Sequence, residues 1–125
     1  MILDTNGLSA LADGDPDLEP VLAGAGEIAI PVIVLGEYRY GIAQSRYRSR
    51  YQYWLTELTA DCRILSIDEE TASEYAQIRG ELKRRGTPIP SNDVWIAALA
   101  RQHHLPVLTR DQRFERVPKL KRVAW

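Results

Sequence analysis

The chain has 125 residues, of which 45% are hydrophobic and 26% charged, so it fits one globular domain of ordinary size over residues 1–125. Its formal net charge of −1 gives no overall attraction to nucleic acid, and its single cysteine, Cys62, excludes an internal disulfide. The longest apolar run, residues 28–35, is too short to span a bilayer. Asp4 follows Met1 too closely for a signal peptide, so we expect a cytoplasmic protein with no membrane partner.

The first quarter of the chain is predicted to contain two strands separated by short helices. Residues 1–4 are a short apolar start that reads as a buried strand ending in a carboxylate. After a turn at residues 5–7, we expect a short helix over 8–12 and a second helix that Pro16 opens and that runs to about residue 24. Small and β-branched residues then predict a strand over 27–31.

The middle of the chain is predicted to be mostly helical. Residues 32–44 and 45–61 carry apolar side chains at helical spacing and are too long for single strands. A strand is expected over residues 63–67. Asp68 is then placed to cap a helix over residues 69–85 that Gly86 ends.

The last third is predicted to hold one helix between two strands. Ser91 or Asn92 is expected to cap a helix that runs to about His103, with strands over residues 106–108 and 121–124. Alternating strands and helices predict an α/β fold, a three-layer α/β/α sandwich around a mostly parallel sheet of four to five strands. Ligands of such sheets bind outside the carboxyl ends of the strands.

Four carboxylates are expected at that edge of the sheet. Asp4 and Asp111 each follow a predicted strand, whereas Glu37 and Asp93 sit early in helices that follow extended segments. A pocket of oxygen ligands favours hard cations such as Mg²⁺ or Mn²⁺ over Zn²⁺. Such a metal screens a phosphate ester and activates a water, so the pattern predicts a metal-dependent nuclease.

The neutral total charge conceals a basic side of the chain. Between Tyr38 and Trp54 there are four arginines, five tyrosines in all and no acidic residue, and the chain from Arg110 onward is rich in arginine and lysine. Arginine and aromatic side chains suit unpaired RNA but are also enriched in protein interfaces, so both uses stay open. The candidates for contact with RNA or a partner are Arg39, Arg46, Arg50 and Arg110.

Four segments together resemble the PIN-domain ribonucleases, and among them the VapC-type toxins of toxin–antitoxin pairs. The segments are DTN at 4–6, GEYRYG at 36–41, NDVWIAALA at 92–100 and LTRDQRF at 108–114. They occur in the family's order and span the whole chain. The resemblance implies Mg²⁺ or Mn²⁺ dependence, cleavage of RNA, a homodimer and inhibition by a cognate antitoxin.

Carried over by position, the resemblance makes Asp4, Glu37, Asp93 and Asp111 the metal-binding and catalytic residues. Asp4 and Asp93 are our choice as direct ligands of the principal ion, with the other two holding a second ion or orienting the attacking water. The resemblance gives Asn6 and Thr109 supporting polar positions, although a turn residue and an ordinary strand-end residue explain them equally well. In toxins of this kind the fourth acidic position often holds Asn, whereas here it is Asp111.

Two other functions compete with the nuclease. The first is a non-catalytic module that binds RNA or protein and uses the acidic cluster as a structural cation site. The second is phosphotransfer through Asp4. It lacks the aspartate two positions later that aspartyl phosphatases use, because residue 6 is Asn. It also lacks the lysine that response-regulator receivers need after a late strand near the pocket, because Arg110 occupies that area.

Overall fold

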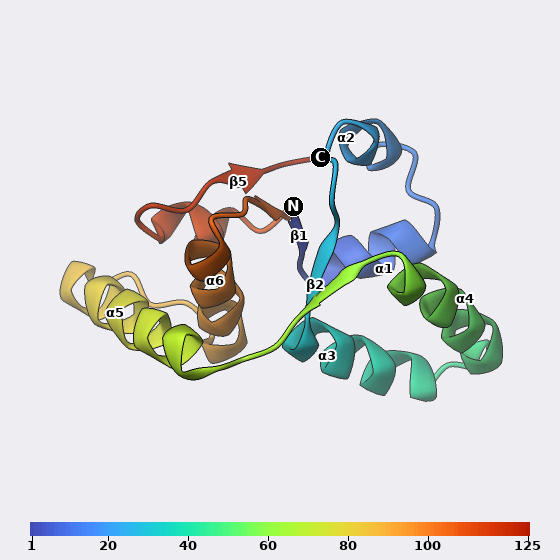
Figure 1. Cartoon of the computed structure of the whole chain (residues 1–125), viewed down its shortest axis with the longest axis horizontal. Helices are drawn as coiled ribbons and strands as arrows, with labels where there is room; N and C mark the ends of the chain where they lie inside the picture. Colours follow the sequence, from blue (N-terminus) through green and yellow to red (C-terminus); the bar gives the residue numbers. More distant parts are fainter.

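Five strands form a parallel sheet at the centre of the computed structural model, which describes residues 1–125 (Figure 1). The strands are β1 (Ile2–Leu3), β2 (Ala29–Pro31), β3 (Arg63–Leu65), β4 (Val107–Leu108) and β5 (Arg122–Val123), in the spatial order β3-β2-β1-β4-β5. Every neighbouring pair is parallel, with Ile2 opposite both Ala29 and Val107. All carboxyl ends therefore lie along one edge, and the predicted parallel sheet is confirmed.

Helices cover the sheet in two groups. They are α1 (Thr5–Ala12), α2 (Glu19–Ala23), α3 (Val32–Ala43), α4 (Arg48–Ala60), α5 (Glu69–Arg85) and α6 (Ser91–His103), with a 3-10 helix, η1 (Gln112–Arg116), before β5. In Figure 1 the sheet runs through the middle, with α5 and α6 on the left and α1, α3 and α4 on the right. This arrangement confirms the predicted α/β fold. None of the helices is both long and apolar enough to cross a membrane.

The central strands supply the core. Ile2, Leu3, Ile30 and Leu108 are fully buried, because helices cover both faces of the sheet. The inward side of α6 adds Ile96, Leu99 and Ala100 to this core, and all three are buried.

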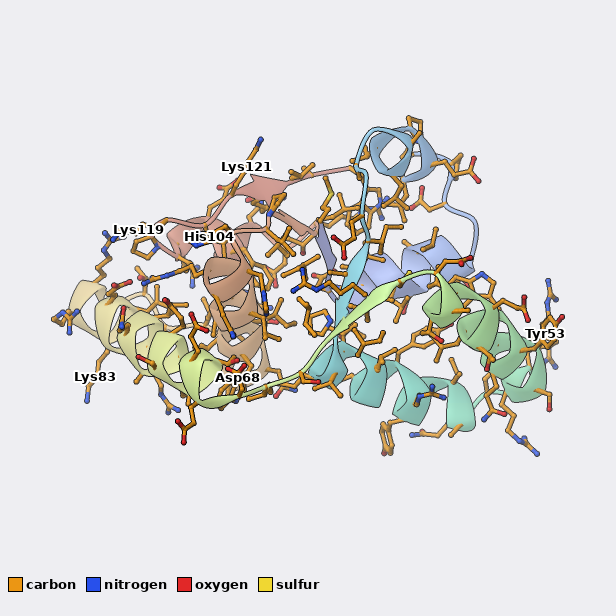
Figure 2. The ribbon with its side chains drawn as sticks, in the orientation of Figure 1. Tyr53, Asp68, Lys83, His104, Lys119 and Lys121 are labelled. Carbon is orange, nitrogen blue, oxygen red and sulfur yellow. The ribbon has the colours of Figure 1, made fainter.

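Helix α5 has clear end signals in the sequence, and both predictions for it are confirmed. The Asp68 carboxylate accepts a hydrogen bond from the Thr71 amide at 3.0 Å, while the Thr71 hydroxyl accepts one from the Asp68 amide, which forms a capping box. Gly86 ends the helix in the left-handed conformation, with φ of 69°. Figure 2 labels Asp68 at the start of this helix.

Three helix starts differ from the prediction. Helix α1 begins at Thr5 rather than at residue 8, because the Asp4 side chain caps it. Helix α2 begins at Glu19 and not after Pro16, since the Asp15 carboxylate accepts the Asp17 amide and forms a turn there. Helix α4 begins at Arg48 instead of residue 45, because the Ser45 hydroxyl accepts the Tyr47 amide in the same way.

The cap predicted for α6 is also wrong. Pro90 occupies the N-cap position, so Ser91 and Asn92 are already helical and neither side chain caps the helix. Their side chains instead reach neighbouring helices, Ser91 toward Tyr75 and Asn92 toward Glu37. No local pattern indicates these two hydrogen bonds, because they depend on where α3 and α5 pack.

The connections of the sheet fix the position of the candidate site. From β1 the chain moves through β2 to β3 on one side, whereas β4 and β5 lie on the other side of β1. The direction of winding thus reverses between β1 and β4. A reversal of this kind opens a crevice at the carboxyl ends of the two strands, where open α/β sheets bind their ligands.

Candidate active site at the carboxyl ends of the strands

Asp4 is the most buried of the four carboxylates, with only 4% of its surface exposed. Its Oδ1 atom accepts a hydrogen bond from the Gly7 amide at 2.8 Å, and its Oδ2 atom accepts one from the Thr109 hydroxyl. Burial raises the pKa of Asp4, and the two hydrogen bonds oppose that rise. The carboxylate at the end of β1 is therefore buried and held in place by two hydrogen bonds.

Thr109 links the ends of β1 and β4. Its hydroxyl donates to Asp4 and accepts the Asp111 amide at 2.9 Å, and the residue is fully buried. Asp111 in turn caps η1 by accepting the Arg113 amide. One hydroxyl thus sets the spacing between Asp4 and Asp111.

Asp93 lies in the first turn of α6 and is half-buried. Burial, followed by the charge of Asp111, raises its pKa to about 6, and the charges of Asp4 and Glu37 act in the same direction. Arg113 opposes the rise. The four predicted carboxylates therefore share one electrostatic environment, although they come from four separate segments of the chain.

Arg113 is the cation of this cluster, and its role was missed in the sequence. Its guanidinium donates from Nε at 3.0 Å and from Nη2 at 2.7 Å to the Asp111 carboxylate, and Nη2 also lies 3.6 Å from Asp93 Oδ2. Hydrogen bonds from Arg113 lower the pKa of Asp111. The pair lies only two residues apart around the start of η1, an element that was not predicted.

Glu37 stands at the outer side of the cluster. It is exposed on α3, and its Oε1 atom accepts a hydrogen bond from Asn92 Nδ2 at 3.1 Å. Asn6 is exposed in the first turn of α1, and its side chain forms no hydrogen bond. As the side chains lie here, no group of three or more His, Cys, Asp or Glu residues is close enough to hold a metal ion.

The four predicted contact arginines differ in their surroundings. Arg110 pairs with Asp15 at 2.8 Å and lies over the Trp125 ring, so it ties the chain end to the loop after α1. Arg39, Arg46 and Arg50 form no ion pair, and Arg46 lies over the ring of Tyr47. Tyr53 projects outward from α4 (Figure 2) and is 70% exposed.

A cleft of about 440 Å³ lies between α1 and α4. Its lining residues are Ala12, Asp13, Tyr47, Arg50, Tyr51 and Trp54. Asp13 and Tyr51, whose hydroxyl donates to the Asp13 carboxylate at 3.0 Å, also line an adjoining cavity of about 220 Å³. The buried Tyr38 hydroxyl in that cavity has no hydrogen-bond partner, and burial raises its pKa to about 12.

The model of the PIN domain family matches residues 1–120. The chain belongs to the PIN-domain family. The ribonuclease VapC5 of Mycobacterium tuberculosis is 34% identical to this PIN domain over 115 residues, which cover 90% of this chain and 84% of that protein. The tRNA(fMet)-specific endonuclease VapC of Shigella flexneri is 33% identical over 101 residues, which cover 80% and 76%.

Solved structures agree with these relatives. The DNA-bound VapBC complex of Salmonella typhimurium matches with a TM-score of 0.88 and 29% identity, over 99% of the PIN domain and 96% of that chain. The predicted resemblance and the predicted class, a nuclease, are confirmed. The roles of the individual site residues stay predictions.

Proposed function

We propose that this PIN domain is a Mg²⁺- or Mn²⁺-dependent endoribonuclease and the toxin of a toxin–antitoxin pair. The observation that carries the proposal is geometric: Thr109 links Asp4 to Asp111, and Arg113 lies against both Asp111 and Asp93, so carboxylates from separate segments lie side by side. In keeping with this, burial and the three other carboxylates raise the pKa of Asp93 to about 6. Such a cluster is unfavourable for folding unless cations or protons neutralise it. Acids with perturbed pKa values at the point where the winding of a sheet reverses are typical of a functional site.

The chemistry of the side chains fits a hard divalent cation. The cluster offers only carboxylate oxygens, and Arg113 already supplies positive charge between Asp93 and Asp111. Asp4 and Asp93 would hold the principal ion, and Glu37 and Asp111 would hold a second ion or orient a water. Because no three of these carboxylates lie close enough to hold an ion here, we expect the Arg113 guanidinium to move off Asp111 and the carboxylates to move closer together when metal binds.

A bound cation would screen the phosphate charge and lower the pKa of the attacking water. Neighbouring side chains would hold the carboxylates in position to bind the cation. Thr109 and the Gly7 amide each bond one oxygen of the Asp4 carboxylate, and each oxygen keeps a further lone pair for metal; Asn92 orients Glu37. Asn6 stands beside Asp4 in the chain and is the polar residue we expect to help orient the water.

RNA is the proposed substrate because relatives are named ribonuclease, and one is named for tRNA(fMet). Arg39, Arg46 and Arg50 form no ion pair with the protein, so they are free to meet phosphates or a partner. Arg110 is held by Asp15, which makes it the weakest of the four candidates. A homodimer and a cytoplasmic location are also part of the proposal.

An antitoxin is the proposed protein partner, since similar solved structures include VapBC complexes. The cleft between α1 and α4 suits a peptide segment because aromatic rings line it and the Tyr38 hydroxyl beside it lacks a partner. An antitoxin arginine that reached the acidic cluster would compete with the cation, because it would pair with the carboxylates as Arg113 pairs with Asp111. Inhibition would then be electrostatic.

Asp4→Asn is the variant that tests this function. We expect it to lose Mn²⁺-dependent cleavage of RNA by at least about a hundredfold, because a ligand charge is removed at the reacting phosphate. The fold should persist with a change of about 1 kcal/mol or less, because Asn caps a helix nearly as well as Asp. Purified tRNA with Mn²⁺ or with EDTA is the first substrate, and the exposed Asp61→Asn is the control.

Two results would contradict the proposal. One is cleavage by Asp4→Asn at the rate of the wild type. The other is an absence of metal-dependent cleavage across a broad set of RNAs, which would favour the alternative, a binding module with a structural cation site.

A further inference from the structure

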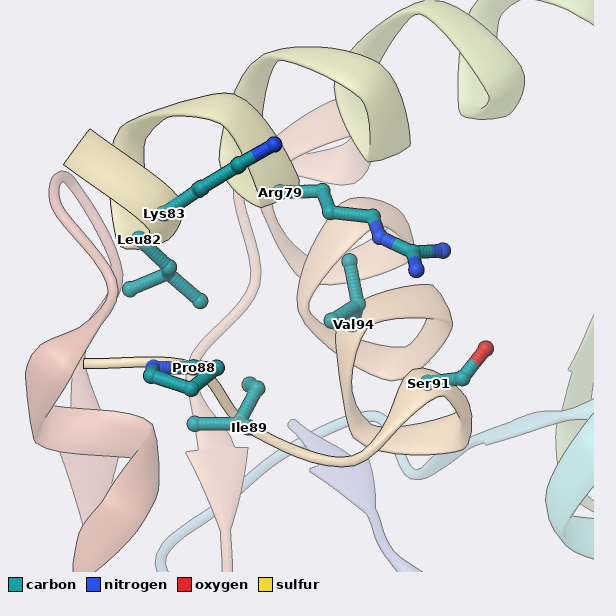
Figure 3. Close-up of a pocket in the computed structure, with 7 residues that line it drawn as sticks. All are labelled: Arg79, Leu82, Lys83, Pro88, Ile89, Ser91 and Val94. Carbon is teal, nitrogen blue, oxygen red and sulfur yellow. The ribbon is translucent and has the colours of Figure 1, made fainter. Parts of the chain in front are cut away.

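A second cavity, of about 440 Å³, lies between α5 and the first turn of α6 (Figure 3). Its floor is apolar and is formed by Leu82, Ile89 and Val94, of which Leu82 and Val94 are buried. None of the acidic residues discussed so far lines it. The cavity is therefore separate from both the carboxylate cluster and the cleft between α1 and α4.

The rim of this cavity carries two cations that no carboxylate neutralises. Arg79 and Lys83 lie one turn apart on α5, both line the cavity, and neither forms an ion pair. In Figure 3 the Arg79 side chain reaches above Val94, whereas the Lys83 side chain runs along α5 at the edge of the cavity. On the same helix, Glu74 and Glu81 are both taken by Arg101 from α6, at 3.1 and 2.9 Å. Positive charge thus stays available on this side of α5.

Aromatic contacts hold Arg79 at the start of α6. Its Nη1 atom donates to the Tyr75 hydroxyl at 2.6 Å, and that hydroxyl lies 3.3 Å from Ser91 Oγ. The Tyr75 ring is stacked on Trp95 with centroids 4.0 Å apart. An arginine placed in this way loses less conformational entropy when it binds an anion than a free surface arginine does.

The cavity also lies close to the carboxylate cluster. Ser91 lines the cavity, whereas Asp93 lies near Arg113. Because these residues are two positions apart in α6, their side chains leave the helix about 200° apart, on opposite sides. The first turn of α6, about 10 Å across with its side chains, is therefore all that separates the two features. A flexible strand bound at the carboxylates can therefore reach the cavity by crossing this one turn.

We propose that the cavity between α5 and α6 binds a nucleotide of single-stranded RNA that flanks the cleaved bond. Arg79 and Lys83 contact phosphate oxygens, while the apolar floor receives the face of the base, the combination that single-stranded RNA sites use. The inference rests on the proposed ribonuclease function, and it adds the path that the RNA strand takes next to the cleaved bond.

The test compares two double variants of α5. Arg79→Ala/Lys83→Ala removes the rim cations, and Arg84→Ala/Arg85→Ala removes the same charge from exposed positions of the same helix that do not line the cavity. Binding of a labelled single-stranded RNA of mixed sequence is measured by fluorescence anisotropy in EDTA at several salt concentrations. Cleavage of the same RNA with Mn²⁺ is measured in parallel.

We expect the rim variant to bind RNA about tenfold more weakly for each cation removed. The salt dependence of log K should fall by about 0.7 for each phosphate that is no longer neutralised, and the control variant should change little. Equal RNA affinity and salt dependence for the two variants, in a wild type that cleaves RNA, would overturn the inference. So would an unchanged RNA affinity with a changed dimer or antitoxin affinity, which would assign the cavity to a protein interface.

These outcomes separate the inference from the proposed function. If the wild type neither binds nor cleaves RNA, the ribonuclease proposal and the inference that rests on it are both wrong. If it cleaves RNA and the rim variant matches the control, only the nucleotide site is wrong.

Discussion

The Asp93 carboxyl is the residue through which pH should act most visibly on this PIN domain. Burial and the charge of Asp111 raise its pKa from 3.8 to about 6, so the folded state holds this proton more tightly than the unfolded state does. The protonated Asp93 carboxyl therefore makes its whole contribution to the free energy of unfolding below pH 3.8, and this contribution is lost as the pH rises through 6. We expect Tm in EDTA to fall more over that interval for the wild type than for Asp93→Asn.

Thermal unfolding between pH 4 and pH 7, followed by circular dichroism, measures this difference. Asp111 does not mask it, because its pKa is lowered and its effect belongs to lower pH. Parallel curves for the wild type and Asp93→Asn would show that Asp93 has an ordinary pKa and would weaken the case for a crowded acidic site.

Arg113 is the residue that we expect to oppose metal binding. Its guanidinium is bonded to Asp111 and lies near Asp93, so a cation can use those oxygens only after the pair opens. The Arg113 side chain is 46% exposed, so water screens the ion pair and its contribution to stability is small. We predict that Arg113→Gln binds Mn²⁺ about two- to fivefold more tightly in calorimetry.

Arg116→Gln is the matched control for that measurement, because it removes a nearby arginine whose hydrogen bond goes to the Pro88 carbonyl and not to the acidic pair. If Arg113→Gln bound Mn²⁺ more weakly than the control, Arg113 would be a support of the metal site and not its competitor.

Helix α1 depends on a close approach at Gly7. A Cβ atom at this position would lie 3.2 Å from Asp4 Oδ1 and 3.2 Å from the backbone oxygen of Leu108, so α1 would have to move away from the ends of β1 and β4. We predict that Gly7→Ala lowers both stability, by about 1–3 kcal/mol, and RNA cleavage, because Asp4 loses its position. Urea unfolding and cleavage assays measure the two effects.

Gly36→Ala provides the contrast on α3. Nothing lies within 4 Å of a Cβ atom at that position, so the better helix propensity of alanine should stabilise the protein by about 0.5–1 kcal/mol. Equal effects of the two substitutions would mean that α1 does not need its close contact with the strands.

The sequence predicted elements well where the signal is local. Asp68 and Gly86 mark the ends of α5, and the apolar runs of β1, β2 and β4 mark buried parallel strands. The predicted start of a helix was wrong where it depends on one side-chain hydrogen bond, as at Asp4, or on tertiary packing. Helix η1 was missed because its start depends on Asp111 bonding to Arg113, which in sequence looks like ordinary charge alternation.

At the scale of the whole molecule, the sequence predicted that carboxylates lie at the carboxyl-end edge of the sheet, but not which cation balances their charge. Asp4 and Asp111 follow β1 and β4, and they lie at one edge because the carboxyl ends of parallel strands share it. Three features arise only when α3, α5, α6 and η1 pack together. They are the contact of Arg113 with Asp93, the hydrogen bond from Asn92 to Glu37, and the position of Arg79 and Lys83 beside α6. No periodicity or local spacing encodes them.

Delivery of carboxylates from four distant segments to a shared divalent-cation site is the property on which the proposed function of this PIN domain depends. Anomalous diffraction from crystals soaked with Mn²⁺ tests this most directly. We predict a Mn²⁺ peak within bonding distance of Asp4 and Asp93, with the Arg113 guanidinium turned away from Asp111. Crystals of protein that cleaves RNA, with Mn²⁺ bound elsewhere and Arg113 still on Asp111, would contradict it.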